Sequence, residues 1–366
     1  MNQMCLLCER TSLDGNLYCQ ETYCPAETSP IILDYGEWFG DIEIVRSLVV
    51  LRSAAIYEVM HQKHRKYMKV AHPGEENKER LKREAEFLQS IAASKDKLDS
   101  LPTLLPPYAN TTIAHDAYGK TMLQGHLLYF YLFEFVPGDT LREVSVKNPQ
   151  LWINHVGWIT IDTAAAINVM HRRGVYHYGL TPECVLVHFD DKKNVPHVLL
   201  LDLGIVSTKE TLRQNWYSFW VPPAYTAPEL VPVDGNGVRG DFRTDVYGLG
   251  MGLYEMLVGE PVYPFKLRSD EEVYRSVLKN KRVEMNRVED VEKIARIATQ
   301  AVSPHMDGRQ PHAAGLAEQL RAYVGDVAGE KKKRQPALRT IMTLVIVLLG
   351  IAFFVTLALM LSEIAR

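Results

Sequence analysis

Short runs of apolar and β-branched residues, separated by polar turns, dominate the first part of the chain. The longest run covers residues 41–51, and shorter ones follow at 56–59 and 66–71. A fourth run, 127–136, is followed by a Pro-Gly pair. Runs of this length and composition predict β-strands bounded by turns. The sequence therefore predicts a strand-rich front part.

Apolar residues at helical spacing mark two other segments. Residues 75–92 are highly charged but keep one apolar face, and residues 152–173 show the same period with fewer charges. This spacing predicts amphipathic helices. Short strand patterns return at 185–189 and 198–201, and the pattern is mostly helical after residue 244. A strand-rich front and a helix-rich back predict an α+β fold with two lobes of unequal size.

The last part of the chain has a different pattern. Residues 341–361 carry no charge, and a helix of about 20 apolar residues can cross a hydrocarbon core of about 30 Å. We expect a transmembrane helix at 340–362, preceded by a basic juxtamembrane linker at 326–339. The positive-inside rule then predicts a single-pass, tail-anchored protein whose preceding domains are cytoplasmic, and the start of the chain lacks the features of a signal peptide.

Four of the five cysteines lie close together at the start of the chain: Cys5, Cys8, Cys19 and Cys24. Two close pairs separated by a short insert are typical of a tetrahedral thiolate site for structural Zn²⁺. Disulfides or free thiols are the alternative, although a cytoplasmic location disfavours disulfides. We therefore predict a zinc-ribbon-like segment at 1–26 and a linker at 27–40.

Charge adds one exclusion to this picture. The formal net charge is −3, and 47% of the residues are hydrophobic. The chain thus lacks the basic character of a nucleic-acid-binding protein and has the composition of a globular one. We expect a membrane and a protein as partners, and no nucleic acid.

Several motifs occur in one order along residues 41–325. A lysine, Lys69, lies in the third predicted strand, and Glu84 lies in the helix that follows. Asp202 stands in a Leu-Asp-Leu-Gly phrase, and Glu229 ends an Ala-Pro-Glu phrase. In these motifs the region resembles the protein kinase family, closest to bacterial Ser/Thr kinases of eukaryotic type. The resemblance implies a two-lobed protein-kinase-like fold over 41–325.

The resemblance also implies roles for the charged residues. Lys69 would hold the phosphates of ATP, and Glu84, rather than its neighbour Glu86, would fix that lysine. Asp202 would bind Mg²⁺ between the phosphates, because phosphoryl transfer depends on positioning and on charge stabilisation. The backbone of Glu134 and Val136 would form the hinge that pairs with adenine.

Other matching positions imply architecture rather than chemistry. Arg309 would form an ion pair with Glu229, and Asp245 would cap the backbone of the catalytic loop. His177 matches the histidine that begins this loop. We expect these four residues to hold the fold.

The catalytic loop departs from the family pattern at its chemical positions. Gly179 replaces the aspartate base, Thr181 replaces the lysine, and Cys184 replaces the asparagine of the second magnesium ion. A thiol is a soft ligand and suits a hard cation poorly. In addition, Tyr178 replaces the arginine that docks an activation-segment phosphate, and Pro222 replaces a threonine of the peptide-binding turn.

The loop that covers the phosphates also departs from the pattern. Its three glycine positions fall at Val49, Leu51 and Ala54, where side chains hinder close approach of the backbone to the phosphates.

These departures predict a pseudokinase, which is a signalling or scaffolding protein with little or no phosphotransfer. ATP and Mg²⁺ binding is expected to be weak. The alternative is an atypical active Ser/Thr protein kinase that retains half of a nucleotide site. In a third interpretation, the zinc-ribbon-like segment performs the specific function of the protein, and the kinase-like domain is only a spacer.

Overall fold

The computed structural model divides the chain into two units, residues 1–325 and 326–366. The predicted zinc cysteines and the predicted transmembrane helix lie outside the described residues. Within the described part, no helix combines the length and apolar character that crossing a membrane requires. The described residues are 2–4, 11–12, 30–92, 94, 98–108, 116–148, 151–190, 194–231, 238–265, 268–279 and 291–326.

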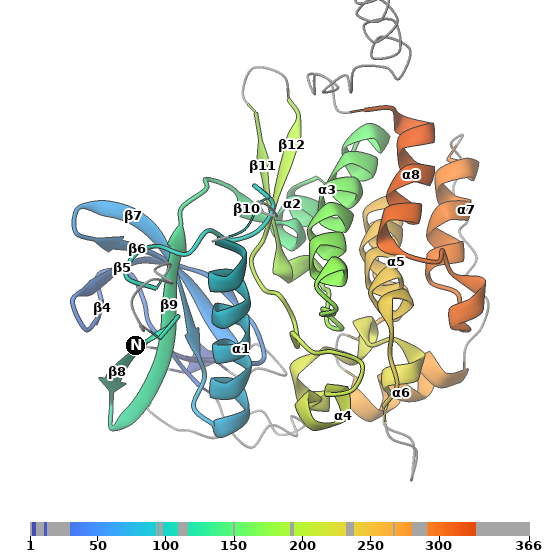
Figure 1. Ribbon diagram of the computed structural model, residues 1–366. Coiled ribbons are helices and arrows are strands. Elements are labelled where there is room, and N and C mark those ends of the chain that lie inside the picture. Colours follow the sequence, from blue (N-terminus) through green and yellow to red (C-terminus); the bar gives the residue numbers. More distant parts are fainter. Residues whose placement is uncertain are drawn as a thin grey trace, which may run out of the picture. The chain divides into compact units, whose positions relative to one another are not determined.

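A six-stranded sheet forms the smaller lobe (Figure 1), and its neighbouring strands are all antiparallel. The strand order is β4-β5-β6-β7-β9-β8. The predicted strands are present, and β4 and β8, which the sequence pattern did not indicate, form the two edges. Because β4 and the core residues Leu33 and Phe39 fall within 27–40, this segment is part of the lobe and the expectation of a linker there was wrong. The bounds are β4 Trp38–Phe39, β5 Ile42–Val50, β6 Ala54–His61, β7 His64–Ala71, β8 Gly119–Leu123 and β9 His126–Glu134.

One long helix, α1 (Glu75–Ala92), packs against β7 and β9 of this sheet. Its buried face includes Leu81, Ala85 and Leu88, while Lys78 and Lys82 pair with glutamates along the exposed side. An apolar stripe with charged residues on the opposite face is what a surface helix needs. The helix has the bounds expected from its spacing.

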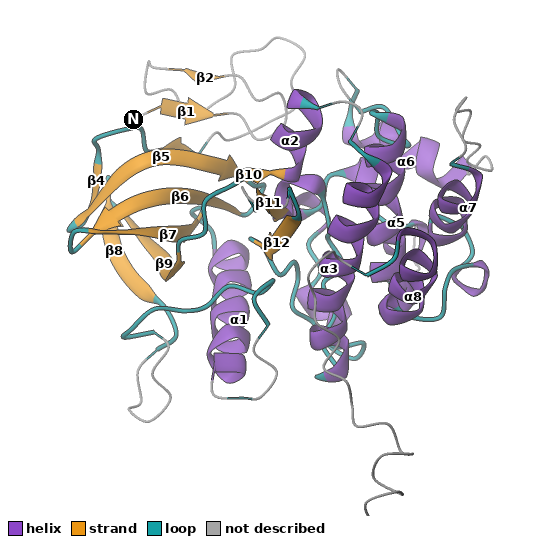
Figure 2. Ribbon diagram, turned by 90° about the horizontal axis from the view of Figure 1, so that it is seen from above, coloured by secondary structure: helices purple, strands orange, loops and turns teal. Residues whose placement is uncertain are grey.

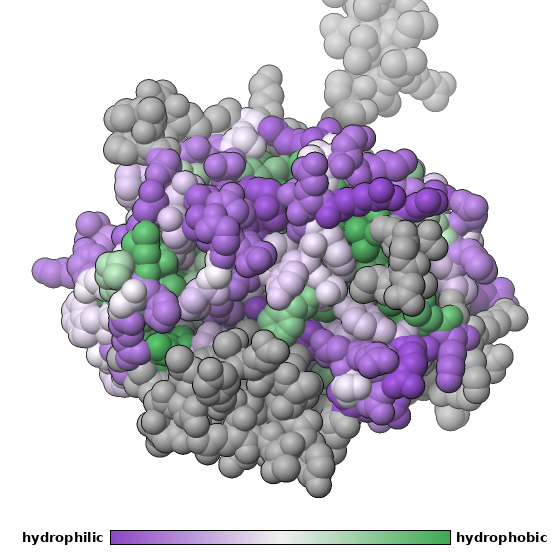
Figure 3. Space-filling model, turned by 90° about the horizontal axis from the view of Figure 1, so that it is seen from below, coloured by the Kyte–Doolittle hydropathy of each residue, from purple (hydrophilic) through white to green (hydrophobic). Residues whose placement is uncertain are grey.

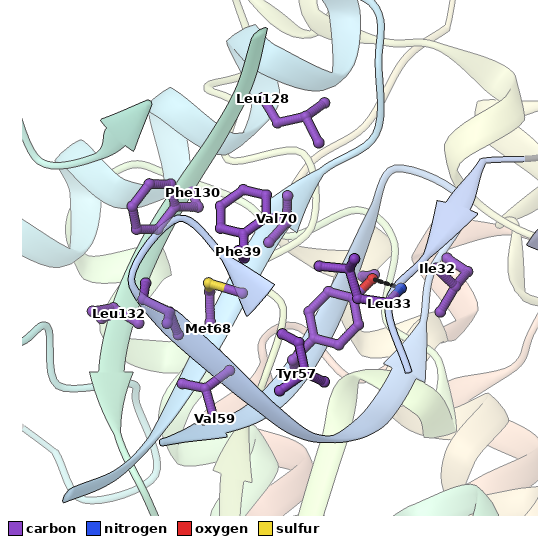
Figure 4. Close-up of a cluster of buried hydrophobic side chains, with 13 residues drawn as sticks. Ile32, Leu33, Phe39, Tyr57, Val59, Met68, Val70, Leu128, Phe130 and Leu132 are labelled. Atoms are coloured by element: carbon purple, nitrogen blue, oxygen red, sulfur yellow. Dashed lines mark hydrogen bonds between the residues drawn. The ribbon is translucent and has the colours of Figure 1, made fainter. Parts of the chain in front are cut away.

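The core of the smaller lobe lies on one face of the sheet (Figure 4). The rings of Phe39 and Phe130 meet edge to face, with centroids 5.3 Å apart. Tyr57 is buried, and its hydroxyl accepts a hydrogen bond of 3.2 Å from the amide of Leu33. The segment that enters the sheet from the N-terminal side is thereby fixed to the core.

A small separate sheet precedes this lobe in the chain, and its strand order is β2-β1-β3. Figure 2 shows its strands β1 and β2. It consists of β1 (Asn2–Met4), β2 (Thr11–Ser12) and β3 (Ile31–Ile32), and β1 pairs antiparallel with both neighbours. Ile32 belongs to the core of the smaller lobe.

The larger lobe is mainly helical (Figures 1 and 2). At its centre, α3 packs against α5 and α8. Gly157 allows α3 and α8 to approach closely, because a Cβ at this position would lie 2.6 Å from the side chain of Val324. The helices are α2 Leu141–Lys147, α3 Ile153–Arg172, α4 Leu212–Asn215, α5 Phe242–Val258, α6 Asp270–Lys279, α7 Glu292–Ala301 and α8 Ala313–Val324.

Shorter elements complete this lobe. A three-stranded sheet in the order β10-β11-β12 lies near the junction with the smaller lobe. Its strands are β10 Asp139–Thr140, β11 Val185–Phe189 and β12 Pro196–Leu200. Five 3₁₀ turns are also described: η1 Pro182–Cys184, η2 Ser218–Trp220, η3 Pro223–Tyr225, η4 Pro228–Leu230 and η5 Met306–Gly308.

The predicted α+β architecture with two unequal lobes is therefore confirmed. The described part of the face in Figure 3 is mostly hydrophilic, and its hydrophobic areas are small and separate. Scattered apolar residues of this kind are normal for a protein surface.

Candidate functional site

Three of the predicted site residues meet between the lobes. The Nζ atom of Lys69, from β7, lies 2.5 Å from Oε2 of Glu84, from α1, and also contacts Oδ1 of Asp202. Asp202 follows β12, and Leu203 next to it donates its amide to the other oxygen of Glu84 at 2.9 Å. Glu86 is exposed, so the structure selects Glu84 as the partner of Lys69.

A fourth charged residue, Arg80, was not expected here. It lies one helical turn before Glu84 on α1, and its Nη2 atom is 2.7 Å from Oδ2 of Asp202. Its Nε donates to the carbonyl of Gly204 at 2.8 Å, and Nη1 donates to the hydroxyl of Ser53 at 2.7 Å. Both carboxylate oxygens of Asp202 are thus bonded to cationic side chains.

Burial and charge act in opposite directions on the two carboxyl groups. For Asp202, burial raises the pKa, but Arg80 and Lys69 outweigh it, and the pKa lies far below its ordinary value. For Glu84, burial is the largest influence and raises the pKa despite the attraction of Lys69. Asp202 is therefore the more firmly ionised of the two.

A side chain of the protein forms a hydrogen bond with the backbone of the expected hinge. Tyr67 lies two residues before Lys69, so its side chain is on the same face of β7. Its hydroxyl donates a hydrogen bond of 2.7 Å to the carbonyl of Val136, and its ring lies 5.3 Å from that of Phe133. Tyr67 is fully buried. A hinge carbonyl is thus already bonded to a side chain, whereas Glu134 is exposed and its amide bonds to another part of the backbone.

The catalytic loop has the backbone frame that the resemblance implied. Asp245 accepts hydrogen bonds from the amides of His177 and Tyr178, at 2.9 and 2.6 Å. Nε2 of His177 bonds to the carbonyl of Asp202 at 2.8 Å, and Nδ1 accepts from the amide of Gly179 at 3.2 Å. Tyr178 has a φ of 59°, so Asp245 holds a residue in a conformation that non-glycine residues rarely adopt.

The side chains at the chemical positions of this loop are small. A Cβ added to Gly179 would lie 2.9 Å from Cγ2 of Val221, so the valine fills the space of a larger residue. Thr181 Oγ1 lies 3.3 Å from the sulfur of Cys184, which is 3.6 Å from Oδ2 of Asp202. Burial raises the pKa of the Cys184 thiol. None of these three positions offers a base for a substrate hydroxyl.

His177, Cys184 and Asp202 could be read as a metal site, since one ligand atom of each lies within 4.8 Å of the others. The donors do not fit a cation, however. Both ring nitrogens of His177 take part in hydrogen bonds, and the raised pKa of Cys184 disfavours a thiolate. Asp202 is already paired with two cations. These residues therefore do not form a magnesium site of the kind that the family resemblance implied.

The predicted structural ion pair is present in the larger lobe. Arg309 bonds to both oxygens of Glu229, at 2.7 and 2.9 Å, and also to the carbonyl of Arg243. Thr244 donates a further hydrogen bond of 2.7 Å to Glu229. Two parallel hydrogen bonds between a guanidinium and a carboxylate are a strong and directional contact.

The loop at the expected phosphate-covering position is a tight turn between β5 and β6. The amide of Leu51 bonds to the carbonyl of Ala54 at 2.8 Å. At its tip, Arg52 reaches the other lobe, where it pairs with Asp270 of α6 at 2.6 Å and lies over the ring of Phe219. The loop is thus tied to the helical lobe and to the segment before the Ala-Pro-Glu phrase.

A family model described as a protein kinase domain matches residues 110–322, more than half of the chain. The chain therefore belongs to the protein kinase family.

Similarity to individual proteins extends over part of the chain. The chain is 30% identical over 220 residues to the serine/threonine-protein kinase PknB of Mycolicibacterium smegmatis. This match covers 59% of this chain and 34% of PknB. The chain is 28% identical over 134 residues to the probable serine/threonine-protein kinase CA_C1728 of Clostridium acetobutylicum, covering 37% and 19%. The chain thus spans about a third or less of these relatives.

A solved structure shares the fold. It is the crystal structure of a double mutant of the PknI kinase domain of Mycobacterium tuberculosis, with a TM-score of 0.51 and 20% identity. The likeness covers 81% of this chain and all of that domain. Identity at this level speaks for the fold alone.

Proposed function

We propose that this protein is a pseudokinase that serves as a membrane-anchored, cytoplasmic signalling or scaffolding protein. The observation that carries the proposal is the emptied catalytic loop. Gly179 stands where a base is needed, and Val221 occupies the adjacent space. Loss of a base alone typically costs about 10²–10⁴-fold in rate, and the loop lysine and asparagine are replaced as well.

ATP binding is weak at most in this proposal. Tyr67 holds the carbonyl of Val136, and a nucleotide would have to displace its buried ring. Arg80 and Lys69 take the oxygens of Asp202 that would otherwise bind Mg²⁺. The partner is then a protein that recognises the folded surface rather than a phosphorylated product.

An atypical active kinase is the second candidate. It is favoured by one observation, the contact of Lys69 with Glu84, which is the arrangement that phosphoryl transfer requires. An active enzyme would have to move Arg80 away from Asp202 and find a base elsewhere.

The test is a phosphotransfer assay on the full chain in detergent micelles. With γ-labelled ATP and general protein substrates, we expect no transfer above that of Asp202→Asn, and no thermal shift with ATP in the presence or absence of Mg²⁺. Turnover at ordinary kinase rates that Asp202→Asn abolishes would refute the pseudokinase and establish the active enzyme.

The N-terminal segment is proposed to hold structural Zn²⁺. Its support is the spacing of Cys5, Cys8, Cys19 and Cys24 in the sequence, which forms two close pairs separated by a short insert. Metal analysis of the purified chain should give one zinc per chain, lost in a variant with serine at Cys5 and Cys8. The absence of zinc would leave free thiols or disulfides as the explanation.

The membrane anchor is also a proposal, based on the uncharged stretch 341–361 and the basic residues before it. The full chain should remain in the membrane fraction after alkaline carbonate washing, whereas a chain that ends at residue 325 should not. Release of the full chain by the wash would exclude a transmembrane anchor.

A further inference from the structure

We infer that Arg80 is a built-in replacement for the metal ion of this fold, and that its guanidinium occupies a specific binding site at Asp202. The inference goes beyond the proposed loss of phosphotransfer, since it concerns what holds the centre of the molecule together.

The guanidinium is bound on several sides. It reaches a carboxylate oxygen of Asp202 at 2.7 Å, the carbonyl of Gly204 at 2.8 Å and the hydroxyl of Ser53 at 2.7 Å. Its carbon lies 5.3 Å from the centroid of the Trp220 ring, and the indole nitrogen of Trp220 is itself fixed by Asn77 of α1 at 2.7 Å. Three acceptors and an aromatic face make a site that fits a planar cation.

Arg80 also balances the charge of a buried cluster. Lys69 and Arg80 contribute two positive charges, and Glu84 and Asp202 contribute two negative charges. Their side chains are exposed by only 2%, 4%, 0% and 2%. A buried charge without a partner is strongly destabilising, so each member of this quartet depends on the others.

A second cation has no favourable place beside this arrangement. A divalent ion at Asp202 would share its oxygens with two cationic groups, and like charges repel strongly in a buried site. The neighbouring donor is the thiol of Cys184, which suits a hard cation poorly. The position of α1 is therefore set by the chain's own arginine and needs no Mg²⁺.

The experiment uses the full chain in detergent with Arg80→Ala, which removes the guanidinium and leaves Asp202 short of a partner. We expect the melting temperature to fall by about 5–10 °C. Millimolar guanidinium chloride should restore at least half of this loss, while sodium chloride at the same ionic strength should not. Mg²⁺ should stabilise Arg80→Ala and leave the wild type unchanged.

The matched control is Arg83→Ala, three residues along the same helix. Arg83 is partly buried, and its Nε donates to the carbonyl of Ile205 rather than to a carboxylate. It should therefore show no recovery with guanidinium. Arg80→Lys keeps the charge but not the planar donor set, so it should lie between Arg80→Ala and the wild type in stability.

Three results would overturn the inference. They are a melting temperature of Arg80→Ala equal to that of the wild type, no recovery of this temperature with guanidinium, or a rise in the melting temperature of the wild type with Mg²⁺. If Arg80→Ala does not fold, the same comparison is made on Arg80→Lys and Asp202→Asn. The two substitutions should then be strongly non-additive, and additive effects would refute the contact. None of these readouts depends on phosphotransfer, so the proposed function can fail while this inference stands.

Discussion

At position 179, the space next to the glycine is filled by the side chain of a neighbouring residue. Gly179 lies against Val221, whose methyl group would be 2.9 Å from a new Cβ. Protein interiors have little spare volume, so a larger residue at 179 would force Val221 or the backbone to move.

Reintroducing the base should therefore fail on its own. Gly179→Asp is expected to cost about 1–3 kcal/mol of stability through overpacking and to give no phosphotransfer. Val221→Ala removes the contacting Cγ2 atom, so Gly179→Asp should cost less stability in the Val221→Ala background than in the wild type. Urea unfolding and the phosphotransfer assay measure both effects. A stable, active Gly179→Asp single variant would contradict the packing argument.

A second residue, His72, gives the smaller lobe a dependence on pH. Burial lowers the pKa of His72 from its ordinary 6.5 to about 4, although the hydrogen bond to the carbonyl of Leu51 favours the charged form. Above pH 6.5 the histidine is neutral in the folded and the unfolded chain. Between pH 6.5 and 4 only the unfolded chain takes up the proton, so the folded state loses stability as the pH falls.

We expect this loss to reach about 3 kcal/mol at pH 4. The glutamine of His72→Gln does not titrate. Between pH 7 and 4, the free energy of unfolding of this variant should therefore fall by about 3 kcal/mol less than the free energy of unfolding of the wild type. Urea unfolding at a series of pH values measures the difference. Parallel curves for the two proteins would show that His72 titrates normally.

The site was predictable from the sequence where a motif fixed the residues. Lys69, Glu84 and Asp202 belong to recognisable phrases, and they meet in the structure. Arg80 was missed because its partner is 122 positions away in the chain and no motif records the pair. Tyr67 did leave a signal, since strand alternation puts it on the face of Lys69, where a large ring fills the space between the lobes.

At the scale of elements, α1 and β11 could be predicted with their bounds because their apolar patterns are long or sharply delimited. The strand expected at 127–136 ends two residues earlier, at Glu134, because the chain leaves the sheet at the hinge. The helix α2 and the strand β8 were not anticipated. Both are short, and their burial depends on neighbours that are distant in sequence.

The ring of Tyr67, on β7, lies against the hinge, where its hydroxyl bonds to the carbonyl of Val136. Replacing Tyr67 with a smaller residue should open the space beside the hinge. Tyr67→Ala is expected to cost about 3 kcal/mol of stability, as large-to-small changes in a core do, and to create an adenosine-binding cavity. Adenosine should then raise the melting temperature of Tyr67→Ala and not that of the wild type.

The matched variant for this prediction is Tyr67→Phe. It removes the hydrogen bond to Val136 but keeps the ring, so it should not bind adenosine. Binding by Tyr67→Phe would mean that the hydroxyl, rather than the bulk of the ring, excludes the ligand. Equal behaviour of Tyr67→Ala and the wild type would show that another group closes the hinge.

At the scale of the whole kinase-like domain, the two lobes are joined through a side chain as well as through the hinge. Arg52, at a loop tip of the smaller lobe, pairs with Asp270 of α6 at 2.6 and 3.0 Å and bonds to the carbonyl of Phe219. Its side chain is 12% exposed, so this ion pair is better shielded than most at a surface. The contact limits how far the lobes can separate.

Breaking this contact should loosen the segment around Phe219 before it unfolds the domain. Arg52→Ala and Asp270→Asn are each expected to increase the rate of amide hydrogen exchange in residues 211–221. In a double-mutant cycle, their effects on the free energy of unfolding should show a coupling of about 1 kcal/mol. Arg65→Ala, which breaks an ion pair with Glu58 inside the smaller lobe, is the control and should leave that segment unchanged. Faster exchange in the control as well would mean that the segment responds to any loss of charge.

The packing of Val221 over Gly179 also bears on how this position can change by mutation. Mutations arrive one at a time, and a single change of Gly179 to a larger residue meets the side chain of Val221. Under the proposed function, such a change lowers stability and brings no activity that selection could favour. A gain of an aspartate base at 179 would therefore require a second, compensating change at 221.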